Sequence, residues 1–216
     1  MKQWLTQRLW LSLTTAVWWL TGCATKPNQP LALHCSDNAL SEGAQSARRA
    51  WFRTHPIWRL SGRAALRFDH RGATVQLNWE EREDGQQIDV VAPLTHQHWR
   101  LLTSTRGKPA RLEGVEDGPH VGPDARKLLW DATGFLLPVN EITNWVRGID
   151  MVGPVERERL DRQQPSSQIE QKGWTIDYQQ WQCPLADQPA LPHRLQARNN
   201  QAQLRLIIDH WDFSPL

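Results

Sequence analysis

The sequence WRLSGRAALRF, residues 58–68, decides the fold class together with two stretches that follow it, ATVQLNW at 73–79 and IDVVA at 88–92. In the first stretch, apolar residues and glycine alternate with residues that are mostly polar or basic. A period of two is typical of a β-strand with one buried face. The second stretch repeats the pattern, and Asp84 with Gly85 indicates a hairpin turn before the third. We therefore predict three consecutive antiparallel strands.

Further runs of this kind follow along the chain. We expect strands at residues 98–103, 108–113, 155–162, 174–178, 193–198 and 203–209. Turn residues between neighbouring runs favour an antiparallel meander. Because each strand has one apolar face, the sheet must curl and at least partly close around that face, which would otherwise stay in water.

Short helices are expected as well, at residues 41–54, 123–133 and 140–148. Ser41 and Asn140 are candidate N-caps, and Gly134 and Gly148 end the second and third helices. The link at 134–139 is apolar for a connection, which favours packing over the sheet or lining a cavity. The predicted fold is mainly β with a few α-helices: an incomplete antiparallel β-barrel (half-barrel), covered by short helices, that encloses an apolar cavity.

The N-terminal residues have the features of an export signal. Lys2 and Arg8 precede an apolar run at 9–20, which is too short to span a bilayer and is typical of a signal peptide. The run leads into LTGC, residues 20–23, which resembles the lipobox of bacterial lipoproteins. We expect residues 1–22 to be removed and Cys23 to carry a diacylglycerol and an N-acyl chain. The alternative is an ordinary cysteine behind a secretory signal.

Removal of this segment changes the charge balance. The chain has 216 residues with 25 basic and 23 acidic side chains, and loss of Lys2 and Arg8 leaves 23 of each. A neutral chain without a basic run is not expected to bind nucleic acid. Residues 23–40 are polar and predict a lipidated tether, and residues 41–216 predict a single domain. Ala24 stands where an aspartate would signal retention in the inner membrane, so we expect the outer membrane.

Common catalytic and cofactor motifs are missing, among them GxSxG, HExxH, the P-loop, GxGxxG and CxxC. His96 and His98 have no third metal ligand at a supporting spacing, so no metal site is expected. The acidic run at 80–84 lies beside a hairpin turn, where charge is usually only solvated. We predict neither an enzyme nor a cofactor beyond the lipid on Cys23. Cys35 and Cys183 are the two remaining thiols, and an oxidising periplasm makes a disulfide between them as reasonable as two free thiols.

A set of loose motifs follows in a fixed order through the rest of the chain. They are WRLSGRA at 58–64, Trp79, APL at 92–94, LLWDATG at 128–134 up to Pro138, WVRG at 145–148, Trp174 to Tyr178, and IDHW at 208–211. Together with the lipobox, this order resembles the LolB family of outer-membrane lipoprotein receptors.

The resemblance implies a receptor without enzymatic activity. It would accept acylated lipoproteins from the soluble periplasmic carrier LolA into an apolar cavity beneath a helical lid, and insert them into outer-membrane lipid. No ATP or metal is implied. Such a protein would be a monomer, anchored by lipid to the outer membrane of a Gram-negative bacterium and facing the periplasm. Transfer would require that the receptor bind cargo more tightly than the carrier does.

The resemblance and the apolar strand positions name candidate functional residues. Leu94, after Pro93, matches an exposed apolar loop residue that passes cargo into the membrane in the family, although Thr95 replaces the usual glycine after it. The alternative for Leu94 is a buried hairpin residue. We expect about half of a larger set to contact the acyl chains. This set is Phe68, Leu77, Trp79, Leu101, Leu129, Phe135, Leu136, Trp145, Trp174, Ile176 and Leu206.

Two other classes of function remain open. One is a lipid-anchored hydrolase that uses His96, His98 or the acidic hairpin, which would require these groups to converge in a pocket. The other is a structural, lipid-anchored envelope scaffold whose barrel interior is filled by side chains. A cavity with affinity for acyl chains would distinguish the receptor from the scaffold.

Overall fold

The computed structural model describes residues 39–149, 157–160, 167–183 and 185–213. All of them belong to the second of two units of the chain, Ala32–Leu216. The predicted signal peptide, the predicted lipidation site Cys23, and Cys35 lie outside the described residues. Cys183 takes part in a disulfide, but its pairing with Cys35 stays a prediction.

The three predicted helices form, and their ends follow from the sequence. Helix α1 spans Glu42–Thr54, and the Ser41 side chain caps it by accepting a hydrogen bond from the Ala44 N–H. Helices α2 (Ala125–Thr133) and α3 (Val139–Arg147) both end at a glycine in the left-handed conformation. The prediction that Asn140 caps α3 is wrong. The helix begins one residue earlier, after Pro138, so Asn140 lies inside its first turn.

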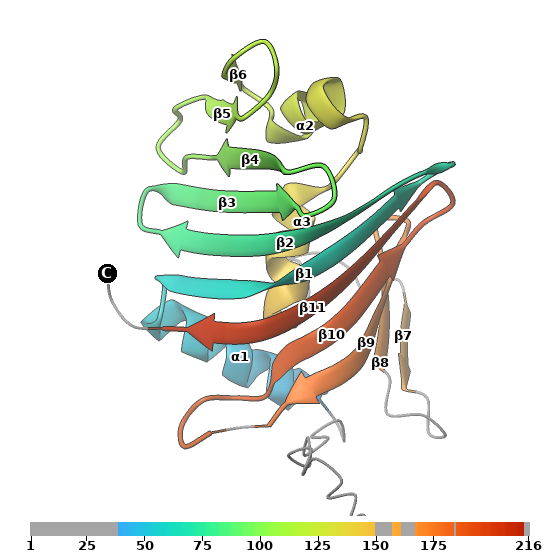
Figure 1. Ribbon diagram of the computed structural model, residues 1–216. Coiled ribbons are helices and arrows are strands. Elements are labelled where there is room, and N and C mark those ends of the chain that lie inside the picture. Colours follow the sequence, from blue (N-terminus) through green and yellow to red (C-terminus); the bar gives the residue numbers. More distant parts are fainter. Residues whose placement is uncertain (1–38, 150–156, 161–166, 184, 214–216) are drawn as a thin grey trace, which may run out of the picture. The chain divides into compact units, whose positions relative to one another are not determined.

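The strands form one antiparallel sheet of eleven strands (Figure 1). Their bounds are β1 Trp58–Phe68, β2 Arg71–Arg82, β3 Gly85–Ala92, β4 Gln97–Leu102, β5 Ala110–Glu113, β6 His120–Gly122, β7 Arg157–Leu160, β8 Ser167–Gln171, β9 Trp174–Gln182, β10 Leu191–Arg198 and β11 Ala202–Asp212. The order is β6-β5-β4-β3-β2-β1-β11-β10-β9-β8-β7. Two meanders are therefore joined by one seam, where the first strand pairs with the last.

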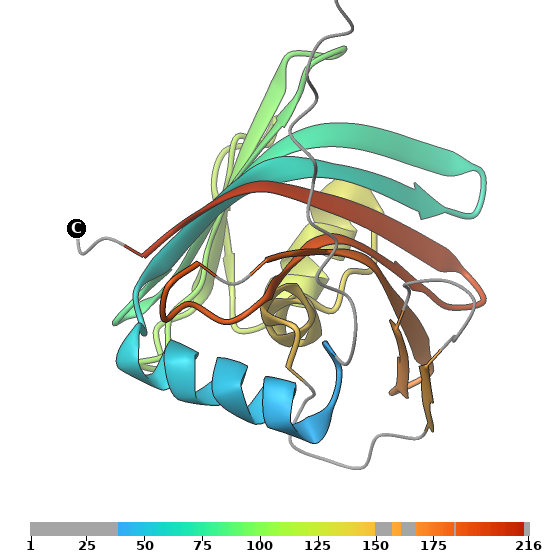
Figure 2. The same cartoon turned by 90° about the horizontal axis from the view of Figure 1, so that it is seen from below.

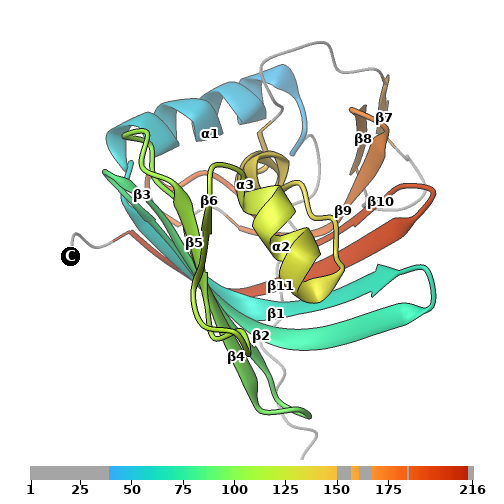
Figure 3. The same cartoon turned by 90° about the horizontal axis from the view of Figure 1, so that it is seen from above.

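The sheet is strongly curved but does not close. Its edges are β6 and β7, and no pairing joins them within the described residues. Helices α2 and α3 lie on the concave side and α1 runs across the open side (Figures 2 and 3). The prediction of an incomplete antiparallel barrel covered by short helices is therefore confirmed.

An aromatic cluster fixes α1 against one end of the sheet. The Phe52 ring lies 6.1 Å from the Trp58 ring and 5.9 Å from the Trp211 ring, measured between centroids. Trp58 in turn lies 5.4 Å from Trp211 across the seam between β1 and β11. Contacts of this geometry add to the stabilisation from buried area, so the cluster ties α1 to both meanders.

Helix α3 is held from three directions. The Tyr178 hydroxyl on β9 donates to the Trp145 carbonyl at 3.0 Å, and the Gln86 amide on β3 donates to the Thr143 hydroxyl at 3.1 Å. Arg48 on α1, which is fully buried, donates to the carbonyl of Gly148 at 2.7 Å. Burial lowers the pKa of Arg48 to about 10, and its guanidinium lies 4.6 Å from the Trp181 ring centroid. Charged hydrogen bonds of this kind fix the C-terminal end of α3.

Candidate functional site

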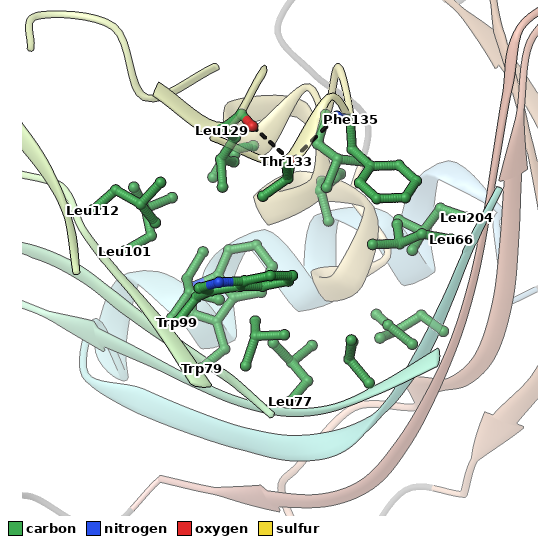
Figure 4. A pocket seen from close by; sticks show the side chains of 18 residues that line it. Leu66, Leu77, Trp79, Trp99, Leu101, Leu112, Leu129, Thr133, Phe135 and Leu204 are labelled. Atoms are coloured by element: carbon green, nitrogen blue, oxygen red, sulfur yellow. Dashed lines mark hydrogen bonds between the residues drawn. The ribbon is translucent and has the colours of Figure 1, made fainter. Parts of the chain in front are cut away.

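A cavity lies between the concave face of the sheet and the helices that cover it. Its volume is about 110 Å³, several times what one water molecule needs. It lies against β1, β2, β3, β4, β5 and β11 on one side and against α2, α3 and the link between these helices on the other (Figure 4). The lining residues are Ala64, Leu66, Val75, Leu77, Trp79, Ile88, Val90, Trp99, Leu101, Leu112, Leu129, Thr133, Phe135, Leu137, Val139, Ile142, Leu204 and Leu206.

The lining is apolar except for one residue, Thr133. Its hydroxyl donates to the Leu129 carbonyl at 2.6 Å and accepts from the Phe135 N–H at 3.2 Å, as the dashed lines in Figure 4 show. These two bonds occupy the hydroxyl within the end of α2. A ligand in the cavity therefore meets almost only hydrocarbon and aromatic surface, which suits an apolar chain.

Six of the eleven predicted cavity residues line this space: Leu77, Trp79, Leu101, Leu129, Phe135 and Leu206. They come from both meanders and from the cover. The predicted alternation therefore gives the correct inward face of β2, β4 and β11.

The other five predicted residues lie elsewhere. Phe68 is buried against Trp130, with 5.6 Å between ring centroids, and Leu136 is 49% exposed. Trp145, Trp174 and Ile176 are buried where α3 covers β9, with the two indole rings 5.5 Å apart. Alternation predicts which side of a strand faces inward, but it does not show that α3 fills the space over β9.

Most of the lining residues that we did not predict share the same signal. Ala64, Leu66, Val75, Ile88, Val90 and Leu204 all fall on the inward phase of strands that we did predict. Choosing every inward residue of β1, β2 and β3 would have found most of them. Trp99 shares the inward phase of β4 with Leu101, and Leu112 lies on β5, so both also fall on predicted strands. The exceptions belong to the cover, where strand alternation gives no signal: Thr133, Leu137, Val139 and Ile142.

The two helices that cover the cavity are not packed equally firmly against the rest of the protein. Helix α3 buries five residues, whereas α2 buries only Leu128. The link after α2 is held by Arg71 on β2, whose guanidinium donates to the Gly134 carbonyl at 3.0 Å and lies 6.0 Å from the Phe135 ring. The cavity is smaller than typical small-molecule sites, which measure about 300–1,000 Å³. Helix α2 and its link are therefore the part of the cover whose movement would expose the fewest buried residues.

Leu94 lies in the turn between β3 and β4, which projects from the sheet (Figure 3). Its side chain is 91% exposed, so the alternative of a buried hairpin residue is wrong. The positive φ of this turn, 57°, is at His96 and not at Thr95. A threonine after Leu94 is therefore compatible with this turn, which does not require glycine there.

The groups that a hydrolase would need do not converge. The acidic residues at 80–84 lie near the start of β3, and His96 and His98 lie just beyond its end. Strand β3 is eight residues long, or about 25 Å, and separates the two groups. His98 instead lies 3.3 Å from the Asp89 carboxylate on the outer face. No group of three or more potential metal ligands occurs among the described residues.

One acidic residue of that hairpin is perturbed. Burial raises the pKa of Glu81 to about 7, against the opposing effects of Arg147 and a hydrogen bond from Gln86. Burial likewise lowers the pKa of Arg147 on α3. This pair lies where β2 meets α3, outside the cavity lining.

This fold and this cavity define a class of protein, an open-barrel binding protein that accepts apolar chains beneath a helical cover. Residues 56–211 match the family described as outer membrane lipoprotein LolB. The outer-membrane lipoprotein LolB of Xanthomonas axonopodis pv. citri is 39% identical over 183 residues, covering 84% of this chain and 83% of the relative. LolB of Xanthomonas euvesicatoria pv. vesicatoria is 37% identical over 202 residues, covering 91% and 92%. LolB of Xylella fastidiosa is 33% identical over 193 residues, covering 89% and 88%.

The chain belongs to the LolB family, as the order of its motifs indicates. No helix in the described ranges has both the length and the apolar character that a membrane span requires.

Proposed function

We propose that this protein is an outer-membrane lipoprotein receptor, which accepts acylated lipoproteins from the periplasmic carrier LolA and inserts them into the outer membrane. The observation that supports this most directly is the cavity, whose lining offers an acyl chain hydrocarbon surface from six strands and the cover. Each methylene buried there contributes roughly 0.8 kcal/mol, so a long chain gains substantial affinity without a single polar contact.

The cavity must enlarge to take such a chain. Helix α2 and the link that follows it move outward, because α2 has one buried residue where α3 has five, and a hydrogen bond from Arg71 to the Gly134 carbonyl ties the link to β2. Leu129, Phe135 and Leu137 leave the cavity lining as the cover opens. Helix α3 stays in place through its contacts with Arg48, Gln86 and Tyr178.

Transfer from the carrier needs no ATP, metal or catalytic residue. Cargo moves toward whichever site buries its chains better, and a difference of about 1.4 kcal/mol already gives a tenfold bias. The exposed apolar side chains Val121, Trp130 and Leu136 lie on β6, α2 and the link, beside the cavity, and suit a carrier that docks there. Release follows at the membrane, where exposed Leu94 enters the lipid.

The lipid on Cys23 would hold the receptor at the outer membrane, facing the periplasm, as a monomer. Three acyl chains exceed what stable anchoring requires. The scaffold alternative is weaker, because a barrel filled by its own side chains would leave no cavity of this size.

A cavity-filling substitution tests the proposal. Ala64→Phe places a ring in the cavity, and Gln76→Phe places the same ring on the exposed outer face of β2 as a control. We expect Ala64→Phe to weaken binding of a fluorescent fatty acid at least tenfold and Gln76→Phe to leave binding unchanged. The free energy of unfolding of both variants checks that the fold survives, because overpacking costs about 1–3 kcal/mol. Equal binding by both variants would favour the scaffold.

A further inference from the structure

Some arginines on the outer face of the sheet have carboxylate partners and others do not. Between the middle of β1 and its end near α1, two of them are neutralised by carboxylates: Arg63 binds Asp209 through two hydrogen bonds of 3.0 and 3.2 Å, and Arg59 binds Glu80 at 3.0 Å. Isolated surface pairs of this kind stabilise the fold little, but they leave no net charge.

The opposite end of the same face carries an arginine cluster, formed by Arg67 on β1, Arg198 on β10 and Arg205 on β11. Arg67 and Arg198 both pair in register with Gln203, and Arg205 lies two residues further along β11. Neighbouring strands lie about 4.8 Å apart, so the three side chains leave the sheet close together.

These three charges are not neutralised. All three side chains are exposed, and none forms an ion pair within the described part of the chain. Arg205 donates to the Gln196 side chain at 3.0 Å, which carries no charge. Asp69, in the turn between β1 and β2, is the acidic residue that borders the cluster, and Asp177, in register with Gln196, has a partner of its own.

Leu94 and two arginines of the cluster, Arg67 and Arg205, share one surface groove. The projecting turn between β3 and β4 forms a corner with the outer face of β1 and β2 (Figures 2 and 3). A groove of about 480 Å³ lies there, lined by Leu94, Arg67, Arg205, His70 and neutral residues, with no acidic side chain. Arg71 also borders it, although its guanidinium is engaged with Gly134.

We propose that this groove binds the phosphates of anionic lipid headgroups and so orients the protein for insertion of Leu94. An exposed apolar side chain beside exposed basic ones is the pattern by which proteins contact a charged membrane surface. An acidic protein would satisfy the arginines but not the projecting leucine, which favours lipid as the occupant. The inference rests on the membrane-facing role of Leu94 in the proposed function.

The test uses the full-length acylated protein in vesicles, without carrier or cargo. Thr95→Cys carries an environment-sensitive fluorophore beside an intact Leu94, and the vesicles contain phosphatidylcholine alone or with phosphatidylglycerol. We expect phosphatidylglycerol to move the fluorophore into an apolar environment, and added salt to reverse this. Each arginine near an anionic surface contributes about fivefold to such an equilibrium, so Arg67→Gln with Arg205→Gln should reduce insertion roughly 25-fold.

The matched control is Arg63→Gln with Arg111→Gln, which removes the same charge from two arginines that have carboxylate partners. It should insert as the parent does. Insertion that ignores phosphatidylglycerol, or equal loss in both double variants, would overturn the inference. Normal insertion by the Arg67 and Arg205 variant would overturn it as well, and slower cargo transfer to that variant, measured separately with carrier and cargo, would then assign the groove to an acidic protein. Phosphatidylglycerol-dependent insertion in a protein that accepts no cargo would refute the proposed function alone.

Discussion

Glu81 shows how burial of one carboxyl couples the stability of this fold to pH. Its pKa in the folded protein is about 7, raised from an ordinary value of 4.5 chiefly by burial. Below pH 4.5 the group is protonated whether the chain is folded or unfolded. As the pH rises toward 7, the unfolded chain loses this proton first, so folding becomes less favourable, and the loss is complete above 7.

Glu81→Gln should remove this loss. The parent should lose free energy of unfolding between pH 5 and pH 8. We expect this loss to be smaller in Glu81→Gln, by an amount on the order of 1–3 kcal/mol. Urea unfolding at the two pH values measures the difference. Glu83→Gln, in the exposed turn of the same hairpin, is the control and should keep the pH dependence of the parent. Identical pH dependence in the parent and Glu81→Gln would show that this carboxyl is not the cause.

A substitution at Leu94 should affect the release of cargo into the membrane but not its capture from the carrier. Leu94→Glu places a charge on an exposed turn outside the cavity lining, so capture of cargo should be unaffected. Insertion of that charge into a membrane is costly, so release of cargo into vesicles should fall sharply. Both steps can be followed with a labelled lipoprotein, and Leu94→Met is the apolar control. Normal release by Leu94→Glu would mean that another surface delivers the cargo.

At the scale of elements, the seam between β1 and β11 holds the two meanders together. The register shifts between Ser61 and Gly62, and a Cβ at Gly62 would lie 2.1 Å from the Ile207 carbonyl oxygen. The backbones approach too closely there for any side chain.

Gly62→Ala should therefore strain the seam. We expect a loss of roughly 1–3 kcal/mol in the free energy of unfolding, because the two strands must separate locally. Ser61→Ala, at the neighbouring outward position, should change stability much less. Thermal unfolding of the two variants gives the comparison, and a Gly62→Ala protein as stable as the parent would show that the seam can adjust without cost.

Some strands can be predicted accurately from the sequence and others cannot, for physical reasons. Strands with one buried face, such as β1 and β2, carry a clear alternation. The bounds of β1 are predicted to the residue, whereas β2 extends beyond both ends of its predicted range of 73–79. Strands β6 and β8 escape prediction, because β6 has only three residues and the five of β8 are mostly polar. Within the cavity, the inward face of each strand is predictable, but the parts of that face that α3 fills depend on long-range packing. For that reason, the prediction that Trp145 and Trp174 line the cavity is wrong.

For the whole molecule, the function that we propose requires a curved sheet whose cover can open, with α2 less firmly attached than α3. The sheet supplies a fixed apolar wall, α3 is fastened to β3, β9 and α1, and α2 with its link forms the part that yields. The resting cavity of about 110 Å³ is then a closed state that avoids exposing a large apolar surface to water.

The most direct measurement is transfer of cargo between proteins. The carrier LolA, loaded with a labelled triacylated lipoprotein, is mixed with this protein, and the two are separated to find where the label resides. We predict that the label moves to this protein, that Ala64→Phe abolishes the movement, and that a lipoprotein without acyl chains is not taken up. Label that stays on a carrier able to deliver to another receptor would contradict the account.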